Sequence, residues 1–223
     1  MKILSISTSS NICAVAVLDD NKLLKEATIN NGYTHSVNLM PMIKELLSQL
    51  NITLEDIDLI VCDKGPGSFT GIRIGIATTK AFSDSLNIKA IGISSLEALA
   101  YNVKESEVIC TIIDAKNNNV YSSIFENTGE QYIVSRKFDF ENIFDLLEDL
   151  KKCEYKITFV GDGAVKYKND ILKYLPASNF SLDNDLSAYN LGLAGYNHYL
   201  EEKFDDVLPL YLRKSQAELN KKI

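Results

Sequence analysis

The chain has 223 residues, 46% of them hydrophobic, and a formal net charge of −7. This composition argues against disorder and provides for one sizeable core or two smaller cores. No apolar run approaches the roughly 20 residues that span a bilayer, and the start is too polar for a signal peptide, so we expect a cytoplasmic protein without a membrane segment. The negative charge repels phosphate backbones, so we expect any contact with RNA to be indirect.

Hydrophobic periodicity divides the first hundred residues into strands and helices. The segments 3–7, 13–18 and 22–29 are rich in apolar and β-branched residues and are separated by short polar turns, which predicts three strands. From His35 to Leu50 apolar residues recur at helical spacing. A buried strand over 57–62 and a glycine-rich turn then lead into a second predicted helix.

The second half of the chain repeats this order. Strands are predicted over 108–114, 120–126, 131–138 and 156–160, and helices from Phe140 to Leu150 and from Ala164 to Leu175. Two βββαβα units in one chain predict an α/β protein with a duplicated ribonuclease-H-like fold and two lobes.

The repeat also sets the predicted domain boundaries. We expect a first lobe over residues 1–104 and a second, smaller lobe over 105–187. A last amphipathic stretch, 188–204, falls outside the repeat and is expected to return to the first lobe as a helix. Residues 205–223 are then a C-terminal tail.

The two-lobed pattern resembles the superfamily of actin, sugar kinases and heat-shock chaperones, in which ATP lies between the lobes. That resemblance implies a carboxylate at the first hairpin of each lobe to organise the metal ion. Asp114 supplies one in the second lobe, but Ser7 stands at the matching position of the first, and neither turn contains glycine. We therefore expect no intact ATP site, and we keep an independent ATP-dependent, kinase-like enzyme as the alternative. A ribonuclease would also need clustered carboxylates, which this hairpin lacks.

The glycine-rich turn after the strand at 57–62 is the most specific stretch of the sequence. It is not a Walker A loop, because no Gly-Lys-Ser or Gly-Lys-Thr ends it. It predicts a helix start capped by Ser68 or Thr70, with backbone N–H groups that could receive an anion. Candidate anion or nucleotide contacts are therefore Ser68, Thr70, Arg73 and Asp114.

Small residues line one face of the helix that follows this turn. Gly71 and Gly75 lie one turn apart, and Thr78 and Thr79 follow. Glycine inside a helix costs about 1 kcal/mol relative to alanine, so the pair indicates another backbone packed very close. That neighbour is either this chain's own first helix or sheet, or a helix of another subunit.

The helix from His35 to Leu50 carries more apolar residues than one face needs. One stripe, which includes Leu39 and Ile43, can cover a sheet, whereas Val37, Met40 and Leu47 lie off it. Burial of a helix on two sides would fit this pattern, so we expect an oligomer interface here.

Metal binding and disulfide chemistry are not expected. The two histidines, His35 and His198, are far apart in sequence, and His35 is interpreted as a helix-start residue. The four cysteines lie far apart without CxxC spacing, and three of them fall in apolar, strand-like runs. We interpret them as reduced structural thiols.

Several stretches together resemble one family. The signature is Gly65-Pro66-Gly67-Ser68-Phe69-Thr70-Gly71-Ile72-Arg73, which is similar to that of the TsaB (YeaZ-like) family, formerly described as glycoprotease-like. Other matching stretches are His35-Ser36 with Leu39 and Pro41, Ser94 to Ala100, Asp114-Ala115 with Val120-Tyr121, and Pro209 to Arg213. They span nearly the whole chain. A peptidase reading rests only on the old family description, since no nucleophile–base pair supports it.

The resemblance implies a non-catalytic subunit of tRNA threonylcarbamoyladenosine synthesis. It implies pairing with TsaD, which carries the metal and transferase site, and work with the ATPase TsaE on ANN-decoding tRNAs, so that tRNA contact stays indirect. TsaD-like proteins carry two histidines a helical turn apart, whereas His35 is here followed by Leu39. TsaB-like chains usually end their first strand with aspartate, which Ser7 replaces. We expect no catalytic residue, no metal and no cofactor, except ATP or ADP at the partner interface.

The resemblance also places the pairing surface on the two helices of the first lobe. Homodimers of the isolated protein are expected to use the same surface. Replacing Gly75 with leucine is expected to abolish pairing while the chain stays folded. The implied interface residues are His35, Leu39, Met42, Ile43, Leu46, Gly71, Ile72, Gly75, Thr78 and Thr79.

Overall fold

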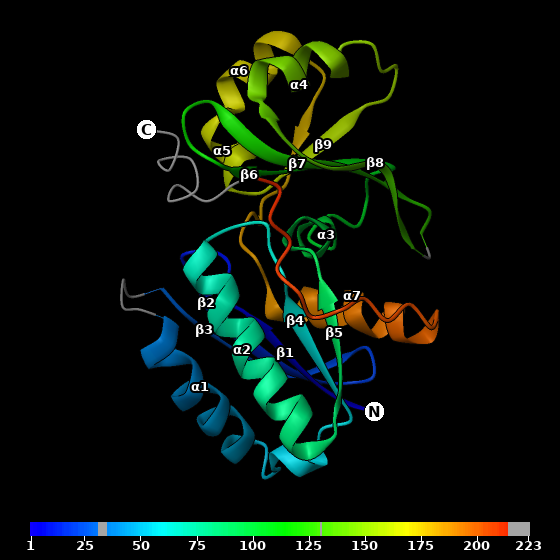
Figure 1. The fold of residues 1–223 in the computed structure, drawn as a ribbon. Coiled ribbons are helices and arrows are strands. Elements are labelled where there is room, and N and C mark those ends of the chain that lie inside the picture. The colour runs from blue at the N-terminus through cyan, green and yellow to red at the C-terminus, as the bar shows by residue number, and fades with distance from the viewer. Residues whose placement is uncertain (31–34, 130, 214–223) are drawn as a thin grey trace, which may run out of the picture. The chain divides into compact units, whose positions relative to one another are not determined.

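The computed structural model describes residues 1–30, 35–129 and 131–213, which form two compact units (Figure 1). Unit 1 comprises Met1–Ala98 and Leu186–Leu210, and unit 2 comprises Leu99–Asp185 and the described residues from Tyr211. The chain therefore leaves unit 1 somewhat before the expected boundary at residue 104. The tail expected over 205–223 is divided, because residues 205–210 pack in unit 1; residues 214–223 lie outside the described residues.

Unit 1 contains a five-stranded sheet in the order β3-β2-β1-β4-β5. Strand β1 is antiparallel to β2 and parallel to β4, so the three antiparallel strands continue into parallel ones as predicted. The elements of this unit are β1 (Lys2–Ser7), β2 (Cys13–Asp19), β3 (Lys22–Ile29), α1 (His35–Gln49), η1 (Leu54–Asp56), β4 (Leu59–Asp63), α2 (Phe69–Leu86), β5 (Lys89–Ile93), the start of α3 (Ser95–Ala100) and α7 (Ala188–Leu200).

Helices cover both faces of this sheet. Alternate residues of a strand point to opposite faces, and Leu4 and Ile6 belong to the core cluster that contains the buried side of α1. Ser5, between them, donates a hydrogen bond from Oγ to the carbonyl oxygen of Ala188 (2.5 Å), and Gly192 packs on the same face. Thus α1 and α2 lie on one face and α7, the returning helix, lies on the other (Figure 1).

Unit 2 repeats the topology of unit 1. Its sheet has the order β10-β9-β6-β7-β8, again with one antiparallel and one parallel neighbour for the central strand β6. This confirms the predicted duplication. Within the described ranges, neither unit has a helix long and apolar enough to cross a membrane. The elements of this unit are β6 (Val108–Asp114), β7 (Asn119–Asn127), β8 (Tyr132–Asn142), α4 (Ile143–Leu150), β9 (Ile157–Val160), α5 (Asp162–Lys166), α6 (Lys168–Tyr174) and β10 (Asn179–Phe180).

Two predicted boundaries in unit 2 are wrong. Phe140 was expected in a helix but lies in β8, because it pairs with Tyr121 of β7. The ring centroids of the two residues lie 5.5 Å apart. The helix starts only after Asn142, whose side chain accepts a hydrogen bond from the N–H of Phe144 (3.0 Å). The single helix expected over 164–175 is two short helices joined at Tyr167, which is buried in the core of this unit.

The buried cysteines behave as structural thiols. Cys13, Cys62 and Cys110 are buried and Cys153 is exposed, and all four are free. Burial raises the pKa of Cys13 to about 11 and that of Cys62 to about 12, because a thiolate loses its hydration there. The interpretation as reduced structural thiols holds for the three buried residues.

One ion pair joins α7 to α3 within unit 1 and makes the stability of the unit depend on pH. His198 Nε2 lies 2.7 Å from Glu97 Oε1, and both side chains are largely buried. Burial disfavours the imidazolium, but the hydrogen bond and the charge of Glu97 outweigh it, and Asp205 adds to them, so the pKa of His198 is raised. The pair therefore stabilises the fold fully below about pH 6.5 and loses its effect as the pH rises through the raised pKa.

Urea unfolding of the protein and of His198→Gln at pH 6.0 and 8.5 checks this. We expect the free energy of unfolding of the unmodified protein to fall by about 1.5 kcal/mol more than that of the variant over that interval, the lower end of the range for a hydrogen bond to a charged group. Equal losses in the two proteins would contradict the assignment.

Candidate functional site

The glycine-rich turn lies at the carboxyl end of β4 and leads into α2. Ser68 caps the helix as predicted, since its Oγ accepts a hydrogen bond from the N–H of Gly71 (3.2 Å). Two backbone N–H groups of the turn, where an anion contact was expected, donate within the chain. The N–H of Gly65 donates to Asp63 Oδ1 (2.9 Å), and that of Ser68 donates to the carbonyl oxygen of Ser9 (2.7 Å). Thr70 and Arg73 lie on the exposed side of the first turns of α2.

The helix glycines are required by this chain's own β1–β2 hairpin. A Cβ at Gly71 would lie 1.9 Å from the carbonyl oxygen of Thr8, and one at Gly75 would lie 2.6 Å from Thr8 Oγ1. Thr8 Oγ1 also donates a hydrogen bond to the carbonyl oxygen of Gly71 (2.7 Å). Their assignment to a contact with another subunit is therefore corrected, and a leucine at Gly75 would disturb the fold itself.

Most of the other expected interface residues are also buried inside unit 1. The buried side of α1 packs on the sheet in one core cluster, so its side chains are not available to a partner. His35 begins α1 as expected and places Nε2 2.8 Å from the carbonyl oxygen of Ser10. Together with Thr78 it is half-buried. The buried residues that this corrects are Leu39, Met42, Ile43, Leu46, Ile72 and Thr79.

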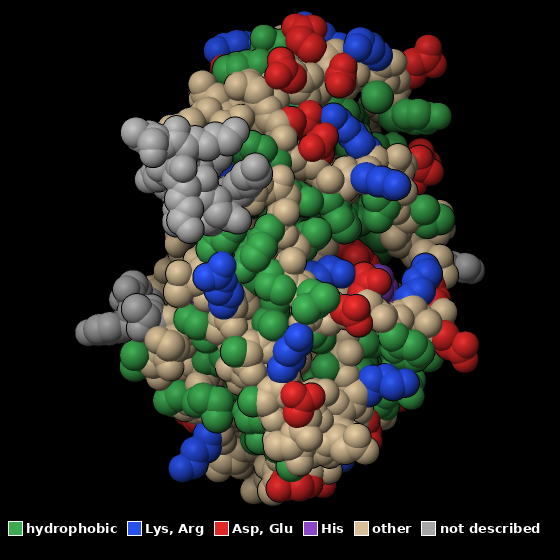
Figure 2. Space-filling view, viewed as in Figure 1, with side chains coloured by type: hydrophobic (Ala, Val, Ile, Leu, Met, Phe, Trp, Pro, Cys, Tyr) green, Lys and Arg blue, Asp and Glu red, His purple; other side chains and the backbone are tan. Residues whose placement is uncertain are grey.

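The same two helices nevertheless expose apolar side chains on the side away from the sheet. Val37 is 63% exposed and Met40 is 49% exposed, as expected for residues off the core stripe, whereas Leu47 is buried. Figure 2 shows green side chains over the helices that Figure 1 labels α1 and α2, with isolated blue and red side chains between them. We call this surface the α1/α2 face; it consists of Val37, Met40, Pro41, Ala77, Thr78 and Ala81.

A fully buried carboxylate, which the sequence analysis missed, lies beside the first hairpin. Asp63 Oδ2 accepts hydrogen bonds from Ser7 Oγ (2.8 Å) and from Ser9 Oγ, and Oδ1 accepts from Ser95 Oγ (2.5 Å) and from the N–H of Gly65. Burial raises the pKa of Asp63, and the four donors oppose that rise. Asp63 thus places a carboxylate from the end of β4 beside Ser7, at the end of the neighbouring strand β1.

Asp114, the candidate metal-organising carboxylate of unit 2, is held by two lysines. Its oxygens lie 2.9 Å from Lys166 Nζ and 3.1 Å from Lys116 Nζ. Burial alone would raise the pKa of Asp114, but these ion pairs outweigh it and lower the pKa. Its own N–H donates to Asp162 Oδ1 (2.9 Å). Asp114 therefore anchors the β6–β7 turn, and both of its oxygens are already engaged by ammonium groups.

No metal centre stands out among the described residues. Within those ranges, no group of three or more His, Cys, Asp or Glu side chains is placed to hold a metal ion. His35 and His198 have separate partners, a backbone carbonyl oxygen and a glutamate.

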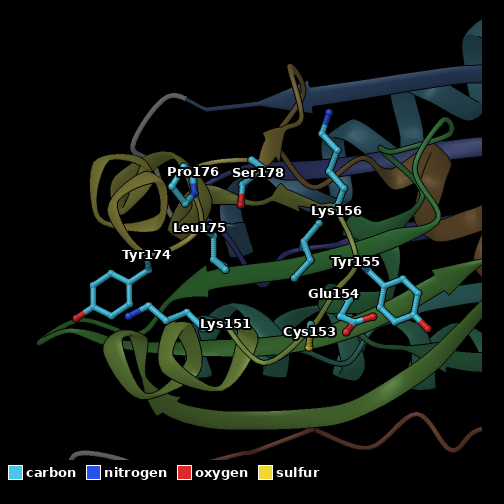
Figure 3. Close-up of a pocket in the computed structure, with 11 residues that line it drawn as sticks. Lys151, Cys153, Glu154, Tyr155, Lys156, Tyr174, Leu175, Pro176 and Ser178 are labelled. Carbon is cyan, nitrogen blue, oxygen red and sulfur yellow. The ribbon is translucent and has the colours of Figure 1, made fainter.

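A surface pocket of about 310 Å³ lies in unit 2 (Figure 3). It is lined by the segment after α4 and by the end of α6. Lys151 lies with Nζ 4.2 Å from the ring centroid of Tyr174 and pairs with Glu148 (3.0 Å), so its charge is already partnered. None of the site residues expected from the sequence lines this pocket.

Comparison with known proteins assigns the family. The family model described as TsaD, tRNA N6-adenosine threonylcarbamoyltransferase, matches residues 23–221. The tRNA threonylcarbamoyladenosine biosynthesis protein TsaB of Bacillus subtilis is 31% identical over 98% of this chain and 96% of its own length. The chain belongs to the TsaB family of tRNA threonylcarbamoyladenosine biosynthesis proteins.

Solved structures agree on the fold. YeaZ from Pseudomonas aeruginosa is 22% identical and has a TM-score of 0.77, with 95% of this chain and 99% of that chain covered. A ROK hexokinase from Thermus thermophilus is 11% identical, with a TM-score of 0.54 over 90% of this chain and 100% of that chain. The second similarity shows that a hexokinase shares the fold of this chain.

Proposed function

We propose that the chain is a non-catalytic subunit that docks on a TsaD-like partner through the α1/α2 face. Together with that partner and a TsaE-like ATPase, it is required for threonylcarbamoyl transfer to the adenosine of ANN-decoding tRNAs. One observation carries the proposal: both helices expose apolar side chains on their outer side, Val37 at 63% and Met40 at 49% on α1, and the small Ala77 and Ala81 on α2. The isolated protein forms homodimers through the same surface.

The state of the two strand-end carboxylates supports a role without catalysis. Asp63 is fully buried under hydroxyl and amide donors, and Asp114 is paired with two lysines. A magnesium ion needs oxygen ligands that are free to face it, so neither carboxylate is suited to hold a metal-bound nucleotide. The chemistry is then performed by the partner, and ATP or ADP enters only where the two subunits meet.

Reconstitution tests this proposal. The chain is combined with the TsaD-like and TsaE-like proteins of the same organism, ATP, a source of threonylcarbamoyl-adenylate and an unmodified ANN-decoding tRNA, and the modified nucleoside is measured by mass spectrometry. We expect modification to fall to background when an equal mass of serum albumin replaces the chain. We also expect the chain alone to hydrolyse no ATP. Full modification without the chain, or ATP turnover by the chain alone, would contradict the proposal.

A further inference from the structure

Asp63 is an unusual group to find inside unit 1. Its side chain is fully buried, and the four hydrogen-bond donors around it are uncharged hydroxyls and one amide. Burying a carboxylate without a cationic partner is costly, and a neutral side chain would fill the same space at lower cost. A carboxyl group at this position therefore calls for a role beyond filling the core.

The hairpin residues that contact Asp63 alternate with residues that contact the helices. Ser7 and Ser9 donate their hydroxyl protons to the carboxylate. Thr8, between them, donates to the carbonyl oxygen of Gly71 in the first turn of α2 (2.7 Å), and the carbonyl oxygen of Ser10 meets His35 Nε2 at the start of α1 (2.8 Å). Four consecutive residues thus connect one carboxylate to the N-terminal ends of both helices.

Close packing leaves this connection little freedom. The N–H of Ser68, the N-cap of α2, donates to the carbonyl oxygen of Ser9 (2.7 Å). A Cβ at Gly67 would lie 2.3 Å from that same oxygen. A shift of the hairpin must therefore move the start of α2 with it, since densely packed backbone cannot absorb the shift locally.

We infer that Asp63 is a positioning residue for partner binding: its carboxylate fixes the Ser7–Ser10 hairpin, and the hairpin sets the position of α1 and α2 beneath the α1/α2 face. This inference rests on the proposed function, because it requires a partner on that face. Asp63 itself is buried and touches no partner. It acts only through the helices.

Two matched serine variants separate positioning from stability. Ser9 and Ser95 each donate a hydrogen bond to Asp63, and their Oγ atoms lie 3.0 Å apart. Only Ser9 belongs to the hairpin, whereas Ser95 begins α3. Ser9→Ala and Ser95→Ala each remove one hydroxyl from the same cluster. We expect both variants to lose a similar amount of Tm. The Kd for the TsaD-like partner, measured by calorimetry at a temperature where both variants are folded, is expected to rise about fivefold for Ser9→Ala and to stay unchanged for Ser95→Ala.

Moving the carboxylate provides a second test. Ser7 follows the β1 residue that pairs with Cys62, so an aspartate at position 7 would reach the same hydroxyls from the neighbouring strand. We expect Asp63→Ser to raise the partner Kd about tenfold or more and the double variant Ser7→Asp/Asp63→Ser to return it to within about threefold of the original value. Ser7→Asp alone puts two buried carboxylates side by side and is expected to destabilise the fold.

The outcomes distinguish this inference from the proposed function. Equal Kd values for Ser9→Ala, Ser95→Ala and the unmodified protein would overturn the positioning role. So would a double variant Ser7→Asp/Asp63→Ser whose Kd for the partner is as high as that of a folded Asp63→Ser protein. If Asp63→Ser does not fold, the serine pair still decides. Met40→Glu, which changes the exposed face and leaves the cluster intact, reports on the face alone: pairing unaffected by Met40→Glu would overturn the docking face and, with it, the positioning role.

Discussion

Replacing Gly71 with alanine is expected to cost unit 1 about 3 kcal/mol of stability or more, the range of severe overpacking. The added Cβ would lie 1.9 Å from the carbonyl oxygen of Thr8, a backbone atom of the first hairpin, and the side chain of the same Thr8 donates a hydrogen bond to the carbonyl oxygen of Gly71. In an exposed helix the same change would stabilise by about 1 kcal/mol, because alanine favours helix more than glycine does. The sign of the effect therefore reports the close approach of the two backbones.

Urea unfolding at constant pH measures this, with Gly75→Ala as the matched control. Gly75 lies one turn later on the same face, but its added Cβ would meet a side-chain atom, Thr8 Oγ1, at 2.6 Å, and a side chain can move more easily than backbone, at the cost of the hydrogen bond that Thr8 donates to Gly71. We expect a smaller loss for Gly75→Ala than for Gly71→Ala. A Gly71→Ala protein as stable as the original would show that the backbones of the hairpin and α2 are not in close contact.

The fold was accessible from sequence because its signals are local. Strands such as 13–18 and helices such as 35–50 carry their periods in consecutive residues, and the recurrence of one element order gave the duplication. The N-cap role of Ser68 is local as well. Errors arose where the contacts of a residue are distant in sequence. Phe140 extends β8 because Tyr121 lies opposite it, and the helical pattern of residues 140–150 contains no information about that contact.

The interface residues were misassigned for a related reason. Periodicity indicated that the stripe through Leu39 and Ile43 can cover a sheet, but the family resemblance placed the same residues in the partner contact, and a helical pattern alone does not tell which side of a helix meets another protein. For α1 the stripe through Leu39 and Ile43 is the core side, and the residues set aside from it, Val37 and Met40, are the exposed ones. For α2 the two possible neighbours of Gly71 and Gly75 were both considered, and the structure selects this chain's own hairpin.

Asp63 was missed because its partners come from three separate segments. Ser7 and Ser9 lie in the hairpin, Gly65 in the signature turn, and Ser95 at the start of α3. One signal was available in the sequence. If the strands at 3–7 and 57–62 are parallel neighbours, their carboxyl ends meet at one edge of the sheet, and the residue after Cys62 falls beside Ser7.

The central claim is that the outer side of α1 and α2 binds a TsaD-like partner. A glutamate in place of Val37 would bury an unpaired charge in that contact, which typically costs an interface 2–5 kcal/mol, or about 30-fold or more in Kd. Val165→Glu is the matched control, because Val165 is also a helical valine with similar exposure, 59% against 63%, but lies on α5 of unit 2. Neither change touches a core residue, so both proteins should keep the original Tm.

The most direct measurement is the Kd of the TsaD-like partner for these two variants and the unmodified chain, determined by calorimetry under identical conditions. We expect Val37→Glu to weaken binding by about 30-fold or more and to abolish tRNA modification in the reconstituted system, while Val165→Glu leaves both unchanged. Equal binding by all three proteins, or a loss confined to Val165→Glu, would contradict it.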